Sequence, residues 1–331
     1  MRKRWQLWLG ILISAVFLYF ALAGLKLGEV WHTVKKANYW WILPGVLVYF
    51  LAVWGRTWRW HYLLLSIEKI PLPRLFPIVV IGYMGNNVYP ARAGELIRAY
   101  VLKKKEGISI SASLATIIVE RIFDGVVMLF FVFVSLPFAP MDPALRRVVI
   151  WSSLLFFGAL GAFFILAASP SRAQALYTWL IERLIPSALR PTFAGIFDRF
   201  MEGLRCLRRG QDVLMIFVTS VFIWLTETTK YWFVMHGFDF NVPFYVLMLM
   251  TAVVNLATTI PSTPGYVGTF DAPGIRILER FGVPGAIAAG YTLVLHAALW
   301  LPITLLGFYY MARESITWRE FGVCTTEARE T

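Results

Sequence analysis

Six apolar runs, each long enough to cross a lipid bilayer, constrain this chain more than any other feature of its sequence. A membrane-spanning helix needs about 20 apolar residues, because each residue advances about 1.5 Å and the hydrocarbon core is about 30 Å thick. With 59% hydrophobic and only 15% charged residues, the 331-residue chain is too apolar for a water-soluble core. We therefore expect an all-α polytopic membrane protein with about six transmembrane helices, at residues 7–25, 40–64, 111–138, 148–168, 213–236 and 283–311.

Basic residues between the runs set the expected orientation, because Lys and Arg concentrate in cytoplasmic loops. Arg2, Lys3 and Arg4 precede the first run, and a basic stretch separates the fourth run from the fifth. Both termini are therefore expected in the cytoplasm. The alternative for residues 1–25 is a cleaved secretory signal peptide, but the apolar run is too long for one.

Two further apolar segments, 76–89 and 244–260, do not fit the topology as crossings. The first has about 14 residues, or roughly 21 Å of helix, which is shorter than the hydrocarbon core. The second is broken at once by the sequence PSTPGYVG. We expect two re-entrant helical hairpins, because Asn, Pro and Gly at such breaks require a shielded polar interior at membrane depth.

The order of these elements repeats along a single transmembrane domain, residues 1–331. Two crossings, a hairpin and a crossing occupy about 1–140 and recur at about 147–312, with a cytoplasmic basic insert at 169–211 and a short cytoplasmic tail at 313–331. Each half has an odd number of crossings, so the halves would form an inverted repeat. Interrupted apolar segments at corresponding positions of inverted halves are typical of transporters that bind substrate between the breaks.

Charged residues follow the first break directly. Asn87 lies at the break, and the spacing of Glu95 and Arg98 places them one helical turn apart, where they can pair. Arg92 is then free to face a cavity, and arginine is suited to bidentate phosphate binding. The alternative is a basic helix edge lying among the headgroups, which is the role we expect for Lys103, Lys104 and Lys105.

Two of the crossings contain charged residues in their apolar interior. The third crossing has Glu120, Arg121 and Asp124, and the fifth has Glu227 and Lys230. Each such charge costs about 2.5–3.5 kcal/mol at a helix centre, so these side chains should face the bundle interior and be paired. Two roles stay open for both groups: ligand or proton binding, and a structural salt bridge.

The second break lies at residues 261–271, with the sequence PSTPGYVGTFD. Its prolines end the incoming helix, and its glycines allow close backbone approach or a positive φ. The next helix would point its N-terminal N–H groups inward, where they suit an anionic headgroup. The alternative is a surface turn outside the membrane. The candidate binding residues here are Pro264, Gly265, Tyr266, Gly268 and Asp271.

Together, the motifs NNVYPARAGELIRAYVL, ERIFDG and IPSTPGYVGTFDAP resemble the transmembrane-domain family of lysylphosphatidylglycerol synthases, which are flippase-like integral membrane proteins. The resemblance covers nearly the whole chain. The second family motif is matched by Glu120, Arg121 and Asp124. The third commonly reads Pro-Gly-Gly-x-Gly followed by Glu, where this chain has Tyr266 and Asp271. The first is matched by Pro90, Arg92, Gly94, Glu95 and Arg98.

The resemblance implies lipid translocation between the leaflets of a prokaryotic plasma (inner) membrane. Some members couple it to a soluble domain that aminoacylates phosphatidylglycerol, and we expect a standalone member without that domain. We expect a transporter rather than an enzyme, acting on a phospholipid or a polyprenyl-phosphate-linked lipid. The alternatives are an integral-membrane transferase with Glu120 or Glu95 as general base, and a noncatalytic scaffold for an envelope enzyme.

The expected partners are membrane lipids with an anionic headgroup and a separate enzyme that makes the lipid. A homo-oligomer is a further expectation, for which Gly24 and Gly28 have the spacing of a helix-dimer contact. We expect no nucleic acid, because most of the Lys and Arg behind the net charge of +12 lie between apolar segments, where they meet headgroups. The two cysteines and four histidines lack ligand spacing, so no metal or cofactor is expected.

Overall fold

A computed structural model of the chain describes residues 25–89, 93–140, 143–167, 210–260 and 263–316, together with residues 12, 16 and 19. Several predictions fall outside these residues: most of the crossing at 7–25, Gly24, Pro90 and Arg92, the basic insert as far as residue 209, and the tail after residue 316. The regular structure of the described part is entirely helical, which confirms the all-α class. It comprises ten α-helices and three short 3-10 helices.

Most of the helices occupy positions that the sequence predicts, with boundaries that differ by a few residues, but the helix at Leu27–Lys36 was not predicted, because it lies between the apolar runs at 7–25 and 40–64. They are α2 (Leu27–Lys36), α3 (Ile42–Leu64), α4 (Leu72–Val88), α5 (Gly94–Glu106), α6 (Ile110–Ser135), α7 (Pro143–Ala167), α10 (Gly210–Met235), α11 (Phe244–Ala257), α12 (Asp271–Arg280) and α13 (Gly285–Arg313). The 3-10 helices are η1 (Tyr39–Trp41), η3 (Leu136–Phe138) and η5 (Pro264–Tyr266). By length and apolar composition, α10 and α13 can each cross a membrane, and α2 with η1–α3 forms a third candidate span that is bent by 71°.

Local sequence signals explain where these helices begin and end. Proline precedes α4, α11 and α13, where a fixed φ and a missing N–H group are tolerated. Ser109 caps α6 by accepting a hydrogen bond of 3.3 Å from the backbone N–H of Ala112. The helix before it, α5, ends at Gly107, whose φ of 76° is the left-handed conformation typical of a helix C-cap.

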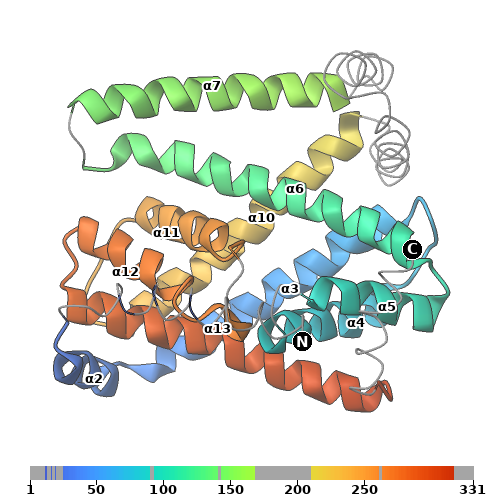
Figure 1. Cartoon of the computed structure of the whole chain (residues 1–331), viewed down its shortest axis with the longest axis horizontal. Coiled ribbons are helices and arrows are strands. Elements are labelled where there is room, and N and C mark those ends of the chain that lie inside the picture. Colours follow the sequence, from blue (N-terminus) through green and yellow to red (C-terminus); the bar gives the residue numbers. More distant parts are fainter. Residues whose placement is uncertain are drawn as a thin grey trace.

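Two helical hairpins lie at opposite ends of the bundle (Figure 1). The first hairpin consists of α4 and α5, and the second consists of α11 and α12. The helices of the first hairpin approach closely at glycines, since a Cβ atom added at Gly85 would lie 2.8 Å from the Cα of Gly94. The return helix expected after Asp271 is confirmed as α12.

The two halves of the chain pack against each other reciprocally. Helix α4 of the first hairpin packs against α13, and α11 of the second hairpin packs against α6. The equivalent helices α3 and α10 pack against each other in an antiparallel sense, because Gly45 lies beside Val234 and Gly55 beside Ile223. In Figure 1, α6 starts at the end of the bundle that holds the first hairpin, whereas α13 starts at the other end. Each hairpin therefore packs on a long helix from the other half of the chain.

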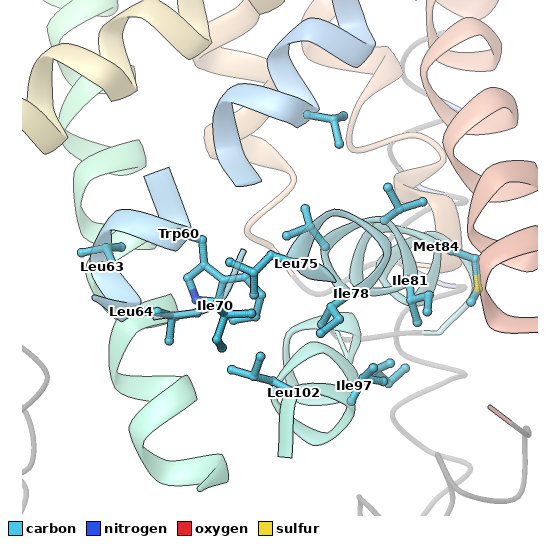
Figure 2. Close-up of a cluster of buried hydrophobic side chains, with 14 of the residues drawn as sticks. Trp60, Leu63, Leu64, Ile70, Leu75, Ile78, Ile81, Met84, Ile97 and Leu102 are labelled. Carbon is cyan, nitrogen blue, oxygen red and sulfur yellow. The ribbon is translucent and has the colours of Figure 1, made fainter. Parts of the chain in front are cut away.

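A buried apolar cluster fixes the first hairpin against α3 (Figure 2). Trp60 from α3, Leu75 from α4 and Leu102 from α5 are all fully buried in it. A second cluster joins the second hairpin to α10 and α13 through fully buried residues such as Val246, Ile275 and Tyr291. Each hairpin is therefore held by its own core.

Candidate functional site

The two predicted breaks meet beside one tryptophan of α13. The indole Nε1 of Trp300 donates a hydrogen bond of 3.4 Å to the backbone carbonyl of Asn87 at the end of α4. The side-chain amide of Asn87 donates to the Thr304 hydroxyl at 2.9 Å. The same indole nitrogen faces η5, where a Cβ atom added at Gly265 would lie 2.8 Å from Trp300 Nε1 and 3.7 Å from the carbonyl oxygen of Asn87. The tips of the two hairpins are therefore within contact distance, as predicted.

A polar cavity of about 140 Å³ lies at this meeting point. Its lining comes from both hairpins and from the helices α3, α6, α10 and α13. Six of the predicted site residues contribute to it: Asn87, Arg121, Glu227, Lys230, Gly265 and Tyr266. The other described candidates lie outside its lining: Glu95, Arg98, Glu120, Asp124, Pro264, Gly268 and Asp271.

A larger and mostly apolar cavity of about 560 Å³ adjoins the polar one. The two cavities share Asn87, Gly265, His296 and Trp300 in their linings. The remainder of the second lining is largely aliphatic and aromatic: Val88, Pro264, Val267, Leu293, Ala297, Thr304 and Phe308. A polar compartment and an apolar compartment thus meet at the hairpin tips.

Glu227 is the centre of the ion pairs that line the polar cavity. Its carboxylate lies 2.5 Å from Arg56 on α3 and also contacts Lys230 on its own helix. The Lys230 ammonium lies 4.4 Å from the centre of the Tyr49 ring, and the Arg56 guanidinium lies 4.8 Å from that of Trp224. All three charged residues are buried. The contact predicted between Glu227 and Lys230 is present, and Arg56 is an additional partner from another helix.

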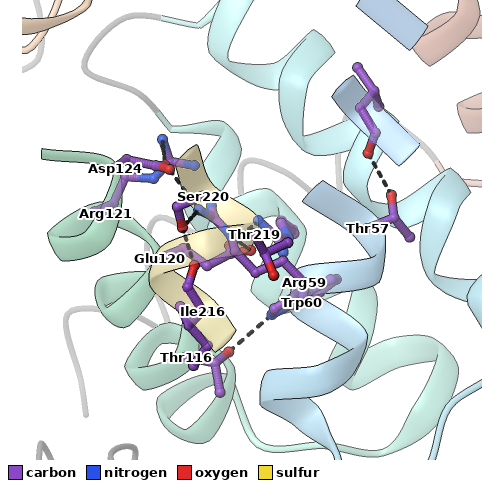
Figure 3. A network of polar contacts seen from close by, with 12 residues as sticks. Thr57, Arg59, Trp60, Thr116, Glu120, Arg121, Asp124, Ile216, Thr219 and Ser220 are labelled. Atoms are coloured by element: carbon purple, nitrogen blue, oxygen red, sulfur yellow. Dashed lines mark hydrogen bonds and ion pairs between the residues drawn. The ribbon is translucent and has the colours of Figure 1, made fainter. Parts of the chain in front are cut away.

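A second charged network joins α3, α6 and α10 next to the cavity (Figure 3). Arg59 of α3 lies 2.7 Å from the carboxylate of Asp124 and 2.6 Å from the hydroxyl of Ser220. Asp124 also accepts a hydrogen bond of 2.9 Å from the indole of Trp224. Arg59 and Asp124 are buried, so removal of either partner would leave a buried charge unpaired. This arrangement ties α6 to α3 and α10.

The pairing of the first hairpin's charges differs from the sequence prediction. The helical spacing allowed Glu95 and Arg98 to pair with each other, but each has its partner on α6. Glu95 lies 3.1 Å from Arg121, and Arg98 lies 2.6 Å from Glu120. The reason is that α5 packs along α6, so its two charged side chains meet the charges of the neighbouring helix. Arg98 also stacks 3.5 Å from the centre of the Trp60 ring, which makes it a buried anchor of the hairpin.

The second break is held by an aspartate and a histidine. Asp271 accepts a hydrogen bond of 2.8 Å from the backbone N–H of Gly268, and its other oxygen lies 2.9 Å from Nδ1 of His296. The Nε2 atom of His296 lies 2.7 Å from the carbonyl oxygen of Gly265. The expected positive φ is present at Gly265 (76°) and Gly268 (81°), and Tyr266 also adopts it at 60°. The carboxylate of Asp271 therefore stabilises the conformation of the loop and does not line the cavity.

The lining of the polar cavity carries an excess of positive charge. Arg56, Arg121 and Lys230 are cationic there, and Glu227 is the one carboxylate that lines it among the described residues. The wider network adds two arginines and three carboxylates, which leaves five cations and four anions. This balance favours an anionic guest. Within the described ranges, no three His, Cys, Asp or Glu side chains are grouped so that they could hold a metal ion.

Several residues of the site were not identified from the sequence, among them Arg56, Arg59, His296 and Trp300. A signal existed for the two arginines, because they interrupt the apolar run of α3 in the same way as Glu120 interrupts that of α6. His296 also gave such a signal, as an ionisable residue within an apolar run, whereas a tryptophan gives none. Only the packing of α13 against α4 and η5 brings His296 and Trp300 to the breaks.

Comparison with known protein families shows that residues 7–307 match the lysylphosphatidylglycerol synthase TM region. The chain belongs to this family. All residues that line the polar cavity fall within the matched range of the family. The multi-pass, membrane-embedded character of the protein follows from the family and from the apolar helices together.

Several archaeal members of known sequence are similar to the chain along most of its length. A UPF0104 membrane protein of Methanothermobacter thermautotrophicus is 23% identical over 316 residues, covering 88% of this chain and 91% of its own. A UPF0104 membrane protein of Methanocaldococcus jannaschii is 22% identical over 91% of this chain and 93% of its own. The glycosyltransferase AglD of Haloferax volcanii is 22% identical over 69% of this chain but only 41% of its own.

Proposed function

We propose that this protein moves an anionic, phosphate-bearing lipid between the two leaflets of the membrane. The observation that carries the proposal is the junction of a cationic polar cavity with a larger apolar cavity at the meeting point of two helix breaks. A membrane lipid has the same two parts, a charged headgroup and apolar chains. The headgroup would occupy the polar compartment, and the chains would extend along α13 and the end of α4.

The chemistry of the polar compartment supports a phosphate group as the guest. Arg56 and Lys230 can donate charge-assisted hydrogen bonds, which are shorter and stronger than neutral ones. Glu227 neutralises part of their charge, so the cavity does not hold several unpaired cations when it is empty. The side-chain amide of Asn87 and the hydroxyl of Tyr266 add neutral hydrogen-bonding groups to the same lining.

The proposal includes a membrane arrangement of six crossings and two re-entrant hairpins. Helix α4 has 17 residues and α11 has 14. At about 1.5 Å per residue these helices reach roughly 26 and 21 Å, less than the hydrocarbon core. Each is followed by an antiparallel return helix, and the two hairpins lie at opposite ends of the bundle (Figure 1). Their tips would therefore meet near the middle of the membrane, where a lipid headgroup needs a polar path.

The reciprocal packing of the halves supports alternating exposure of the cavity to the two leaflets. In inverted repeats, each half can adopt the conformation of the other, which exchanges the open and the closed side. Here the contact of α4 with α13 and the contact of α11 with α6 are the equivalent pair. Loosening one contact while tightening the other would move the opening of the cavity from one leaflet to the other.

Reconstitution of the full chain in phosphatidylcholine vesicles tests the proposal. The probes are fluorescent phosphatidylglycerol and, as the control for headgroup charge, fluorescent phosphatidylcholine, each read by quenching of the outer leaflet with an impermeant reductant. We expect protein-dependent quenching of the inner-leaflet phosphatidylglycerol and much slower quenching of phosphatidylcholine. Quenching at the rate of protein-free vesicles for both probes would overturn the proposal. A new lipid species detected by mass spectrometry would favour the transferase. The absence of both lipid movement and a new lipid species would favour the scaffold.

A further inference from the structure

The imidazole of His296 lies between two hydrogen-bond acceptors. Its Nδ1 atom is 2.9 Å from a carboxylate oxygen of Asp271, and its Nε2 atom is 2.7 Å from the carbonyl oxygen of Gly265. A neutral imidazole carries a hydrogen on one nitrogen only, so it can donate to one of these oxygens but not to both. The observed bridge therefore requires one additional proton, which is held on the imidazole or shared with the carboxylate.

Loss of that proton would release the loop at the second break from α13. The carboxylate of Asp271 also accepts the backbone N–H of Gly268 at 2.8 Å, so both acceptors belong to the loop and its return helix. His296 is the partner that α13 contributes. Without the proton, one of the two contacts would place two lone pairs opposite each other, and the contact would open. The remaining contact of His296 with Phe270, a stacking of rings 4.4 Å apart, does not depend on the proton.

The conformation of the loop makes it ready to move once released. Tyr266 has a φ of 60°, which is an unfavourable conformation for an aromatic residue, and Gly265 and Gly268 flank it with φ values of 76° and 81°. Such conformations persist when the surrounding contacts impose them. The bridge through His296 is one of those contacts.

The first hairpin has no comparable proton-dependent contact among its described ion pairs. Its return helix α5 is held on α6 by Glu95 with Arg121 and by Arg98 with Glu120. Arginine remains protonated at all physiological pH values. The return helix α12 of the second hairpin is held on α13 at the equivalent place by Asp271 and His296. The first hairpin is therefore held by arginine–carboxylate pairs and the second by a histidine–carboxylate pair.

We propose that Asp271 and His296 form a proton-binding latch on the second hairpin, through which protons control the movement of lipid. Proton binding forms an N–H bond on the imidazole and closes the loop on α13; proton loss opens it. The link to lipid movement rests on the proposed function, whereas the latch itself does not. The other ionisable groups that share the cavity with His296 are Arg56, Arg121, Glu227 and Lys230, together with Tyr49, Tyr83, Tyr231 and Tyr266.

Nuclear magnetic resonance of ¹⁵N-histidine in the full chain, placed in phosphatidylglycerol-containing nanodiscs, measures the latch directly. Hydrogen exchange of the amides of residues 263–272, corrected for the intrinsic effect of pH, measures closure of the loop. We expect His296 to carry hydrogens on both ring nitrogens at low pH, and exchange to accelerate by about tenfold or more as that proton is lost. The latch would be overturned if the His296 ring stayed neutral from pH 5 to 9. It would also be overturned if the hydrogen-exchange rates of the loop amides did not change as the ring lost its proton.

Two substitutions and one control separate the latch from a merely structural role. Asp271→Asn can donate its amide to Nδ1 of a neutral His296, so the loop should stay protected at high pH. His296→Gln should remove the pH dependence of exchange altogether. His236→Gln is the matched control, because His236 is an exposed histidine that contacts the carbonyl oxygen of Trp232. It should behave as the unmodified protein. If hydrogen exchange in His296→Gln still depended on pH as in the unmodified protein, the assignment of the latch to His296 would be contradicted.

Vesicles with a pH gradient test the link to lipid movement. The rate for fluorescent phosphatidylglycerol should change several-fold when the gradient is imposed, and Asp271→Asn should abolish that response. A gradient without effect on a working transporter would overturn the link. If the unmodified protein moves no lipid at any pH, the proposed function fails, and resonance and exchange measurements still decide whether the latch exists.

Discussion

The guanidinium of Arg56 on α3 lies 2.5 Å from the carboxylate of Glu227 on α10, so a buried ion pair joins the equivalent helices of the two halves. Both side chains are more than nine-tenths buried, and Lys230 contacts the same carboxylate. Charges removed from water in this way depend on their partners, because solvent cannot compensate for a partner that is lost. The stability of the bundle is therefore sensitive to this carboxylate.

We expect Glu227→Gln to lower the free energy of unfolding by about 3–5 kcal/mol, because Arg56 and Lys230 would face each other without a counter-charge. Reversible unfolding in mixed detergent micelles would measure the change. The matched control is Glu279→Gln, which removes the carboxylate of a pair with the exposed Arg276 at 2.9 Å. It should cost less than about 1 kcal/mol. Equal costs for the two substitutions would contradict a central role for the buried pair.

Lys230→Gln should slow movement of phosphatidylglycerol while affecting phosphatidylcholine much less. The substitution removes one of the three cations that line the cavity. An anionic headgroup should therefore bind more weakly, whereas a zwitterionic headgroup should be affected less. The matched control is Lys104→Gln, which removes an exposed lysine of α5 and should leave both rates unchanged. An equal effect of Lys230→Gln on both lipids would argue that Lys230 serves the fold alone.

Gly265→Ala should strongly reduce lipid movement in a protein that still folds. Gly265 and Gly107 both have a φ of 76°, so alanine at either position costs about 1–2 kcal/mol in backbone energy. Only at Gly265 does the new Cβ meet a side chain, Trp300, at 2.8 Å, whereas no atom lies within 4 Å of a Cβ at Gly107. Gly107→Ala is therefore the control for backbone strain. Identical lipid rates for the two variants would remove η5 from the site.

Gly268→Val should also abolish movement, although Gly268 does not line the polar cavity, so the valine would not occupy the place of the headgroup. Its φ of 81° excludes a β-branched residue, and its N–H group binds Asp271. The valine should therefore disrupt the closed loop, which faster hydrogen exchange at residues 263–272 would show. Normal exchange with normal transport would contradict this account.

Single cysteines at Arg74 and Asp239 test the membrane arrangement, in a protein whose Cys206 and Cys324 are replaced by serine. Arg74 lies at the start of α4, Asp239 lies between α10 and α11, and both are exposed. A membrane-impermeant thiol reagent should label Arg74→Cys only from the cytoplasmic face and Asp239→Cys only from the opposite face. Labelling of both from one face would exclude hairpins that enter from opposite sides.

The sequence by itself determined most of the helices and the two breaks, because apolar length and the positions of proline and glycine act locally. The short helix α4 and the left-handed glycines at 265 and 268 follow from such signals, although α4 has 17 residues where about 14 were expected. It also identified Glu120, Asp124, Glu227 and Lys230, since a charge inside an apolar run must be paired wherever the helix packs.

Only the tertiary structure decided which charges pair and which side chains reach the cavity. Glu95 binds Arg121 rather than Arg98 because α5 lies along α6, and Arg98 is used to anchor the hairpin through Glu120 and Trp60. His296 acquires its two acceptors from residues 25 and 31 positions earlier in the chain. Helical spacing specifies which face of a helix a residue occupies, but the partner on that face depends on how helices distant in sequence pack together.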